Sequence, residues 1–259
     1  MPYHHEIEVA LNIADGAGKL ALGYFDQETL TEEKADLSPV TIADRECEKF
    51  ISGRLEANFP EDGIVGEEGA YKVSISGRRW LIDPIDGTRD FVRRNPYWSV
   101  QLALQDNGRV VLGLIHLPRL GETVQAVKGS GCYWNDARVQ GSSIGRLDKA
   151  ILTVGGFASV WGKWPPEGVR YLTEKCWGVR AYGGCYDVVM IARGKVDVWL
   201  SGSGMEWDYA PARIIAEECG VSFLTRSGED RIDADNCLLC PPRLEPELRR
   251  ILGIKLATE

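Results

Sequence analysis

Histidine is scarce in this sequence: only three of its 259 residues are histidines. His4 and His5 lie near the amino terminus and His116 lies in a strand-like apolar run, so we expect each to be solvated or structural. Histidine is the commonest metal ligand in proteins. Its scarcity disfavours a zinc centre and favours oxygen ligands for any bound metal.

The sequence also lacks long apolar runs and an excess of basic residues. No run approaches the roughly 18 residues of a membrane-spanning helix, and residues 1–10, MPYHHEIEVA, lack the basic and apolar regions of a signal peptide. There are 38 acidic side chains and 30 basic ones, giving a net charge of −8, whereas a nucleic-acid-binding protein needs a basic face. We therefore expect a cytoplasmic protein that binds neither membranes nor nucleic acids.

The seven cysteines are an odd number scattered over the chain, which indicates reduced thiols rather than a disulfide framework. Cys237 and Cys240 have the CxxC spacing of redox and zinc motifs. No second pair accompanies them, and the two intervening leucines favour a buried strand. A redox or metal role for this pair is the less favoured alternative.

The periodicity of apolar residues predicts two different halves. Helical spacing over 6–25, and over a second segment that opens at Thr41 or Asp44 and runs to about residue 58, is followed by strand-like segments in the first half. Strands and helices alternate after residue 149, and the last predicted helix, 208–219, is ended by Gly220. We expect an N-terminal α+β domain over 1–143 and a C-terminal α/β domain over 144–259. The strands expected in the first half are 99–104, 110–117 and 122–127, and those in the second are 151–154, 179–181 and 196–200.

Residues 80–91, WLIDPIDGTRDF, place two carboxylates directly after a buried apolar step. A buried carboxylate is costly unless a cation meets it. Pro84 stiffens the turn that aims Asp83 and Asp86 at one point, and the Ile85 carbonyl lies between them. Gly87 lets the backbone approach a ligand closely. Such an all-oxygen set selects Mg²⁺, Mn²⁺ or Ca²⁺.

Two further acidic residues follow the same logic. Glu67 follows the apolar step Ile64-Val65, and Asp208 follows Trp207 at a predicted helix start. Each segment alone is also typical of a turn or a solvated loop. Together they favour a metal centre, because a bound cation offsets the negative field of the clustered carboxylates.

These segments carry a resemblance to the inositol monophosphatase superfamily of Mg²⁺-dependent, lithium-sensitive phosphatases. The resemblance implies a layered αβαβα sandwich of the inositol monophosphatase and fructose-1,6-bisphosphatase type, with the site between the two halves. It also implies a homodimer. The matching segments are KADLSPVTIAD (34–44), GEE (66–68), WLIDPIDGTRDF (80–91) and WDYAPARIIAEECG (207–220).

The resemblance further implies two or three Mg²⁺ ions, with Mn²⁺ possible in their place. One ion would bind Glu67, Asp83 and the Ile85 carbonyl, and a second would bind Asp83, Asp86 and Asp208. A third, weaker ion would bind Glu67 through waters. Asp44 and Thr88 would polarise the attacking water, so that the expected catalytic residues are Asp44, Glu67 and Thr88.

The expected substrate is a small phosphorylated metabolite. Ser201 occupies the position where inositol monophosphatases have a glutamate that contacts inositol. Segments 87–104 and 177–199 are instead similar to the histidinol-phosphatase branch, although that branch often has an acidic residue where this chain has Gly184; Asp187 is a candidate substitute for it. We expect hydrolysis of histidinol phosphate to histidinol. Inositol 1-phosphate or sugar phosphates are the alternative, followed by 3′-phosphoadenosine-type nucleotides. The expected substrate contacts are Asp86, Gly87, Thr88, Arg89, Gly184, Ser201 and Asp208.

Overall fold

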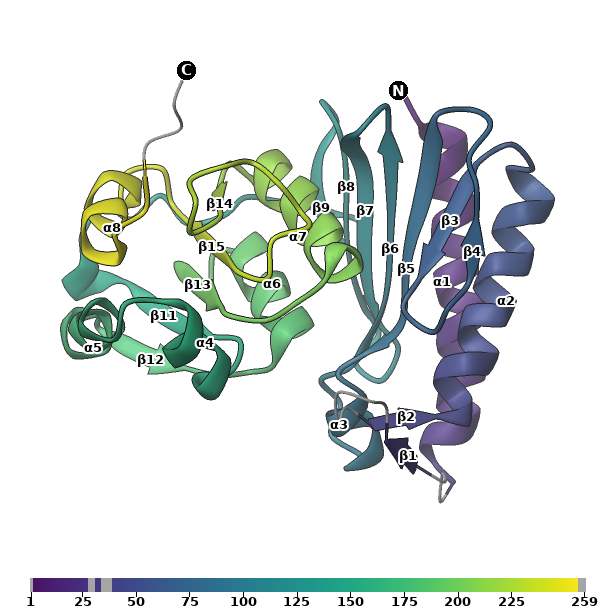
Figure 1. The fold of residues 1–259 in the computed structure, drawn as a ribbon, viewed down its shortest axis with the longest axis horizontal. Coiled ribbons are helices and arrows are strands. Elements are labelled where there is room, and N and C mark those ends of the chain that lie inside the picture. Colours follow the sequence, from purple (N-terminus) through teal and green to yellow (C-terminus); the bar gives the residue numbers. More distant parts are fainter. Residues whose placement is uncertain (1, 28–30, 34–38, 256–259) are drawn as a thin grey trace.

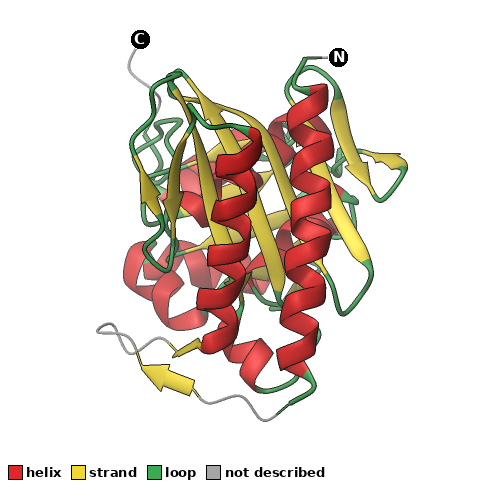
Figure 2. Ribbon diagram, turned by 90° about the vertical axis from the view of Figure 1, so that its right-hand side faces the viewer, coloured by secondary structure: helices red, strands yellow, loops and turns green. Residues whose placement is uncertain are grey.

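Two long helices cover one face of the larger sheet (Figures 1 and 2). The computed structural model describes residues 2–27, 31–33 and 39–255, so residues 34–38 of the first family-like segment lie outside the described residues. The helices α1 (His4–Phe25) and α2 (Ile42–Asn58) confirm the predicted ones. The short strands β1 (Thr31–Glu33) and β2 (Pro39–Thr41) form a separate ribbon before α2.

The larger sheet has eight strands in the order β10-β9-β8-β7-β6-β5-β3-β4. Its pairs are antiparallel except β3 with β5, which are parallel. Strand β5 continues through the acidic turn, with an irregularity in register between Asp83 and Asp86. The strands are β3 (Gly63–Gly66), β4 (Tyr71–Lys72), β5 (Arg78–Asp86), β6 (Ser99–Asp106), β7 (Arg109–Leu117), β8 (Glu122–Val127), β9 (Gly131–Trp134) and β10 (Ala137–Val139).

The smaller sheet has five strands in the order β12-β11-β13-β15-β14. Strand β11 is parallel to both neighbours, whereas β15 is antiparallel to β13 and β14. The predicted buried strand around Cys237 and Cys240 is confirmed as β15, and both thiols are free and buried. The strands are β11 (Ile151–Val154), β12 (Gly178–Arg180), β13 (Val198–Ser201), β14 (Ser222–Leu224) and β15 (Cys237–Cys240).

Five layers alternate along the molecule (Figure 1). Helices α1 and α2 pack on the outer face of the larger sheet, and helices α6 and α7 share a core with the inner faces of both sheets. Helices α4, α5 and α8 cover the outer face of the smaller sheet. The predicted αβαβα sandwich is therefore confirmed. The helices are α3 (Thr88–Val92), α4 (Phe157–Lys163), α5 (Pro166–Lys175), α6 (Gly184–Ala192), α7 (Glu206–Cys219) and α8 (Glu245–Leu252), with a 3₁₀ turn, η1, at Leu147–Lys149.

Helix α7 comes from the C-terminal half of the sequence but packs against the larger sheet. Gly113 on β7 makes this approach possible, because a Cβ there would lie 2.6 Å from Ile214 Cγ2 and 2.8 Å from Pro211 Cα. The N-terminal sheet ends at Val139 and the second sheet begins at Ile151. The division into domains at residues 143 and 144 stays a prediction.

Candidate active site and metal centre

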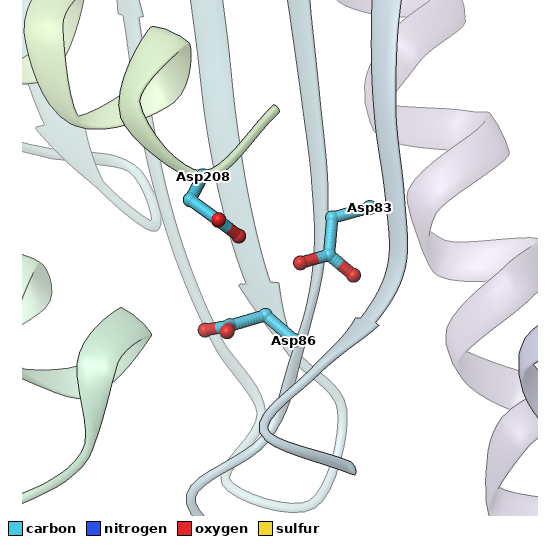
Figure 3. Close-up of side chains that lie close together, drawn as sticks. All are labelled: Asp83, Asp86 and Asp208. Atoms are coloured by element: carbon cyan, nitrogen blue, oxygen red, sulfur yellow. The ribbon is translucent and has the colours of Figure 1, made fainter. Parts of the chain in front are cut away.

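Three carboxylates converge where β5 meets the first turn of α7 (Figure 3). Asp83 and Asp86 come from β5 and Asp208 from α7. One oxygen of each lies within 4.8 Å of the others. Asp83 is buried, and Asp86 and Asp208 are half-buried. The structure thus brings together residues that are up to 125 positions apart, a spacing short enough for shared cations.

The turn after Asp83 is fixed by local backbone geometry. The Ile85 amide donates to Asp83 Oδ1 at 3.1 Å. Gly87 has φ 85°, in the left-handed region, and a Cβ there would lie 2.9 Å from the Tyr97 carbonyl oxygen. Glycine is therefore required at this position. Helix α3 then begins at Thr88.

The first turn of α7 orients Asp208. Its Oδ2 accepts a hydrogen bond from the Met205 amide at 2.6 Å, and its own amide donates to the Met205 carbonyl at 3.1 Å. A carboxylate in this position accepts a hydrogen bond from a free amide at the start of the helix. Its negative charge also interacts favourably with the positive end of the helix dipole. One oxygen of Asp208 is thereby tied to the helix while the side chain faces β5 (Figure 3).

Burial and neighbouring negative charges raise the pKa values of the three carboxylates. Burial raises the pKa of Asp83 well above its usual range, and the charges of Glu67, Asp86 and Asp208 add to this effect. Burial, with the charge of Asp86, raises the pKa of Asp208 to about 7. Burial also raises the pKa of Asp86, while Cys185 offsets part of the rise, its amide donating to Asp86 Oδ2 at 3.1 Å. A divalent cation among them removes this penalty, so the donor set fits a hard metal ion.

Asp44 and Thr88 meet beside this centre. Thr88 Oγ1 lies 3.3 Å from Asp44 Oδ1 and 3.2 Å from the Ile85 carbonyl oxygen. The other oxygen of Asp44 accepts from the Thr41 amide at 2.8 Å and from the Thr41 hydroxyl at 2.6 Å. Burial raises the pKa of Asp44 and these Thr41 hydrogen bonds lower it. Asp44 is thus a fixed acceptor behind the Thr88 hydroxyl.

Glu67 lies on a loop that is held by a buried acidic side chain. Glu48, on α2, accepts from the Glu68 amide and the Ala70 amide, both at 2.7 Å. The Glu67 amide donates to the Ile82 carbonyl at 3.1 Å. Glu48 was missed from the sequence, where it reads as one more acidic residue on a helix; its side chain is only 3% exposed.

A cavity of about 390 Å³ contains the convergence point. Asp44 lies behind it, through Thr88. The structure brings the other predicted site residues together at this cavity. They are Glu67, Asp83, Ile85, Asp86, Gly87, Thr88, Arg89, Gly184, Ser201 and Asp208.

Several polar residues of the cavity wall were missed from the sequence, among them Gln101 and Asp90. Gln101 lies opposite Asp83 in the register of β5 and β6 and is buried. A glutamine inside an otherwise apolar strand was the available signal. Asp90 also lines the cavity and is half-buried. Its signal was weaker, because an acidic residue in the first turn of a helix is common.

Other candidates lie outside the cavity wall or face inward. Asp187 is fully buried and accepts hydrogen bonds from the Thr153 hydroxyl at 2.5 Å and from the Tyr182 amide at 3.2 Å. It does not line the cavity, so it does not replace the acidic side chain that Gly184 lacks. Arg93 is exposed and also outside the lining. The Ser201 hydroxyl lies 2.9 Å from the Ser203 carbonyl oxygen and 3.0 Å from the Tyr209 hydroxyl.

Comparison with known proteins agrees with the fold and the acidic centre. A model of the inositol monophosphatase family matches residues 3–253. The chain is 39% identical to a histidinol-phosphatase of Chlorobaculum parvum, over 89% of this chain and 90% of the relative. It is 35% identical to a histidinol-phosphatase of Mycobacterium tuberculosis, over 87% and 89%. A solved IMPase structure from Thermotoga maritima superimposes with a TM-score of 0.88 at 27% identity, covering 96% of this chain and 97% of that one.

The fold and site therefore define a metal-dependent phosphoric monoester hydrolase. The chain belongs to the inositol monophosphatase family. Its substrate class is a small phosphorylated compound. None of the described helices is long and apolar enough to cross a lipid bilayer.

Proposed function

We propose that this protein hydrolyses histidinol phosphate to histidinol and inorganic phosphate with Mg²⁺ as its metal. The observation that carries the substrate is the similarity to proteins named histidinol-phosphatase over nearly the whole of both chains. We also propose that the protein is a cytoplasmic homodimer. An IMPase-like activity on inositol 1-phosphate or sugar phosphates is the second candidate, and the similarity to the Thermotoga maritima IMPase favours it.

The residues present fit two cations. Glu67, Asp83 and the Ile85 carbonyl would hold one, and Asp83, Asp86 and Asp208 the other; a third would rest on Glu67 through waters. When bound, such ions supply the positive charge that activates water and stabilises the departing alkoxide. Substitution of Mn²⁺ is compatible with the same oxygen donors. In keeping with this site, we expect Li⁺ to inhibit; undiminished turnover at high Li⁺ would contradict that expectation.

Asp44 and Thr88 orient the attacking water. The Thr88 hydroxyl lies within hydrogen-bonding distance of Asp44 Oδ1, whose carboxylate is fixed on its other side by Thr41. A water that donates to Thr88 Oγ1 can pass its proton toward Asp44 as its oxygen attacks phosphorus. General base catalysis of this kind contributes typically about 10²–10⁴-fold.

Asp90 supports a substrate with a positively charged leaving group. Its Oδ1 accepts from the Asn95 side chain at 2.8 Å, and a Cβ on Gly183 would lie 3.5 Å from its Oδ2. Oδ2 thus faces the start of α6 across the cavity, and no hydrogen bond to it is found among the described residues. Histidinol phosphate carries an ammonium group on the carbon next to its phosphoester carbon. We assign Asp90 as the carboxylate that receives this ammonium group.

The test is phosphate release with Mg²⁺ from a panel of phosphate esters. It compares histidinol phosphate with inositol 1-phosphate, fructose 1,6-bisphosphate, adenosine 3′,5′-bisphosphate and glycerol 2-phosphate. We expect kcat/KM for histidinol phosphate to lead by at least about tenfold, equal to about 1.4 kcal/mol in transition-state binding. A flat panel, or a lead for inositol 1-phosphate, would instead support the second candidate.

A further inference from the structure

An ion pair joins the two elements that carry the metal carboxylates. Arg79 lies on β5 and Glu206 is the first residue of α7. Arg79 Nη2 donates to Glu206 Oε2 at 2.6 Å and Nη1 donates to Oε1 at 3.2 Å, a two-pronged contact. Gln105 holds the guanidinium from the other side, with Arg79 Nε donating to its Oε1 at 2.6 Å. The pair therefore has a defined geometry.

Strand β5 and helix α7 contact each other, and the ion pair and the metal centre lie at opposite ends of this contact. Alternate residues of a strand share a face, so Arg79, Leu81 and Asp83 all point from β5 toward α7. Leu81 is fully buried in the core that contains α7. Asp83 faces Asp208 (Figure 3). The contact between strand and helix thus has an attractive charge pair at one end and like charges at the other.

The like charges act against this contact until a cation binds. One carboxylate oxygen of each of Asp83, Asp86 and Asp208 lies within 4.8 Å of the others, so their negative charges repel one another at this end of the contact. Glu206 is two residues from Asp208 in the same helical turn, so holding Glu206 also holds the backbone that presents Asp208. The side chains of Arg79 and Glu206 are 35% and 21% exposed, and such pairs add little to global stability. Their effect falls on the local placement of Asp208.

We propose that Arg79 and Glu206 are positioning residues that set the affinity of the metal centre. They keep the first turn of α7 against β5, so that Asp208 is already near Asp83 when a metal ion arrives. A pre-organised donor set loses less conformational freedom on binding. This inference rests on the proposed metal ligands, and its test separates the two.

The test measures metal binding to the metal-free full chain, with Tb³⁺ luminescence as a probe that needs no turnover. We expect Arg79→Gln and Glu206→Gln each to raise the half-saturating Tb³⁺ concentration by about tenfold, as removal of groups that orient metal ligands does elsewhere. The Mg²⁺ concentration for half-maximal phosphate release should rise in parallel, with kcat at saturating Mg²⁺ and the melting temperature nearly unchanged. Arg79→Lys, which keeps the cation, should recover part of the affinity.

The sign of the two effects distinguishes positioning from a plain field effect. Through charge alone, loss of the Arg79 cation would strengthen metal binding and loss of the Glu206 anion would weaken it. Positioning predicts that both changes weaken metal binding. It also predicts that the double variant binds the metal as tightly as the single variant with the lower affinity. Opposite signs, or unchanged affinity in both, would overturn the proposal.

Two controls complete the experiment. Arg213→Gln removes another cation of α7, which pairs with Asp230 and Glu217 in the cavity that Arg79 also lines; it should leave metal affinity unchanged. Asp208→Asn tests the metal assignment itself. If Asp208→Asn leaves Tb³⁺ binding intact, the proposed metal ligands fail; if it weakens binding while the Arg79 and Glu206 variants do not, only the positioning role fails.

Discussion

Two cavities of the molecule are rich in carboxylates but differ in how these carboxylates are paired. In the charged cavity that Arg79 lines, each acidic residue has an arginine partner: Glu206 pairs with Arg79, Glu217 and Asp230 pair with Arg213, and Asp233 pairs with Arg231. In the active-site cavity, Asp83, Asp86 and Asp208 face one another, and no ion pair to them is found among the described residues. The first cavity neutralises its charge internally, whereas the second leaves room for an external cation.

The pKa values of the two cavities differ in the same direction. The Arg231 side chain lowers the pKa of Asp233 to about 2, whereas burial beside Asp86 raises the pKa of Asp208 to about 7. A carboxylate with a built-in cation is structural, and a carboxylate whose ionisation is opposed by its neighbours is a candidate ligand. The number of acidic residues in a cavity therefore does not distinguish structural carboxylates from candidate ligands.

The sharpest way to break this comparison is to remove one carboxylate from each cavity. Asp208→Asn should lower kcat/KM by more than about a thousandfold, equal to about 4 kcal/mol, because a metal donor and its charge are lost. The matched change Asp230→Asn should leave kcat/KM within about twofold, a change of less than 1 kcal/mol. Phosphate release with Mg²⁺ measures both, and circular dichroism checks the fold. Retained activity in Asp208→Asn would show that the metal assignment is wrong.

The loop that carries Glu67 offers a second test, with a smaller effect. Glu48→Gln keeps the shape of the side chain but replaces one of the two accepting oxygens by an NH2 group, so one of the hydrogen bonds from the Glu68 and Ala70 amides is lost and the other loses its charge assistance. We expect a loss of about 1–3 kcal/mol of stability and a higher Mg²⁺ requirement, because Glu67 loses its fixed loop. Glu56→Gln, on the exposed part of the same helix, is the control. Equal melting temperatures in the two variants would contradict this role.

Asp90 tests whether the cavity reads the leaving group. Asp90→Asn should reduce kcat/KM for histidinol phosphate by about tenfold or more, since a hydrogen bond to a charged group contributes about 1.5–3 kcal/mol. Turnover of glycerol 2-phosphate, which has no ammonium group, should be nearly unchanged. A parallel fall for both esters would instead assign Asp90 to the general structure of the site.

Local sequence predicted the turn that presents two of the converging carboxylates, and distance in the chain limited the rest. The DPIDGT turn could be interpreted because Asp83, Asp86, Gly87 and Thr88 are constrained by their immediate neighbours. The pairing of Arg79 with Glu206 could not, because 127 residues separate them and either could pair with any surface charge. Gln101 became informative only when the register of β5 and β6 placed it opposite Asp83. Which residues form the wall of the cavity depends on how the two sheets pack together, and the periodicity of apolar residues does not predict that packing.

The layers were easier to predict than their exact ends. Helical spacing in 6–25 and the Thr41 cap of the second helix follow from local chemistry, and both helices formed as expected. Helix α6 begins at Gly184, where the Cys185 amide donates to Asp86. Here a contact from the other half of the chain decides where the helix starts.

The pH dependence of stability gives the most direct link between charge and metal. The pKa of Asp208 in the folded chain, about 7, exceeds the ordinary value for an aspartic acid, about 4. The folded state therefore holds a proton that the unfolded state releases, so the metal-free protein loses stability as pH rises between these two values. Asp187, whose pKa burial raises to about 6, contributes in the same direction.

Bound Mg²⁺ should remove the part of this loss that arises at the metal centre, because the cation replaces the proton. We expect the melting temperature of the metal-free protein to fall across this range, by about 2–4 °C for each kcal/mol of stability lost. With saturating Mg²⁺ the fall should be smaller, and in metal-free Asp208→Asn it should shrink as well. If neither Mg²⁺ nor Asp208→Asn changes the fall of the melting temperature with pH, the fall arises at Asp187 and not at the three converging carboxylates.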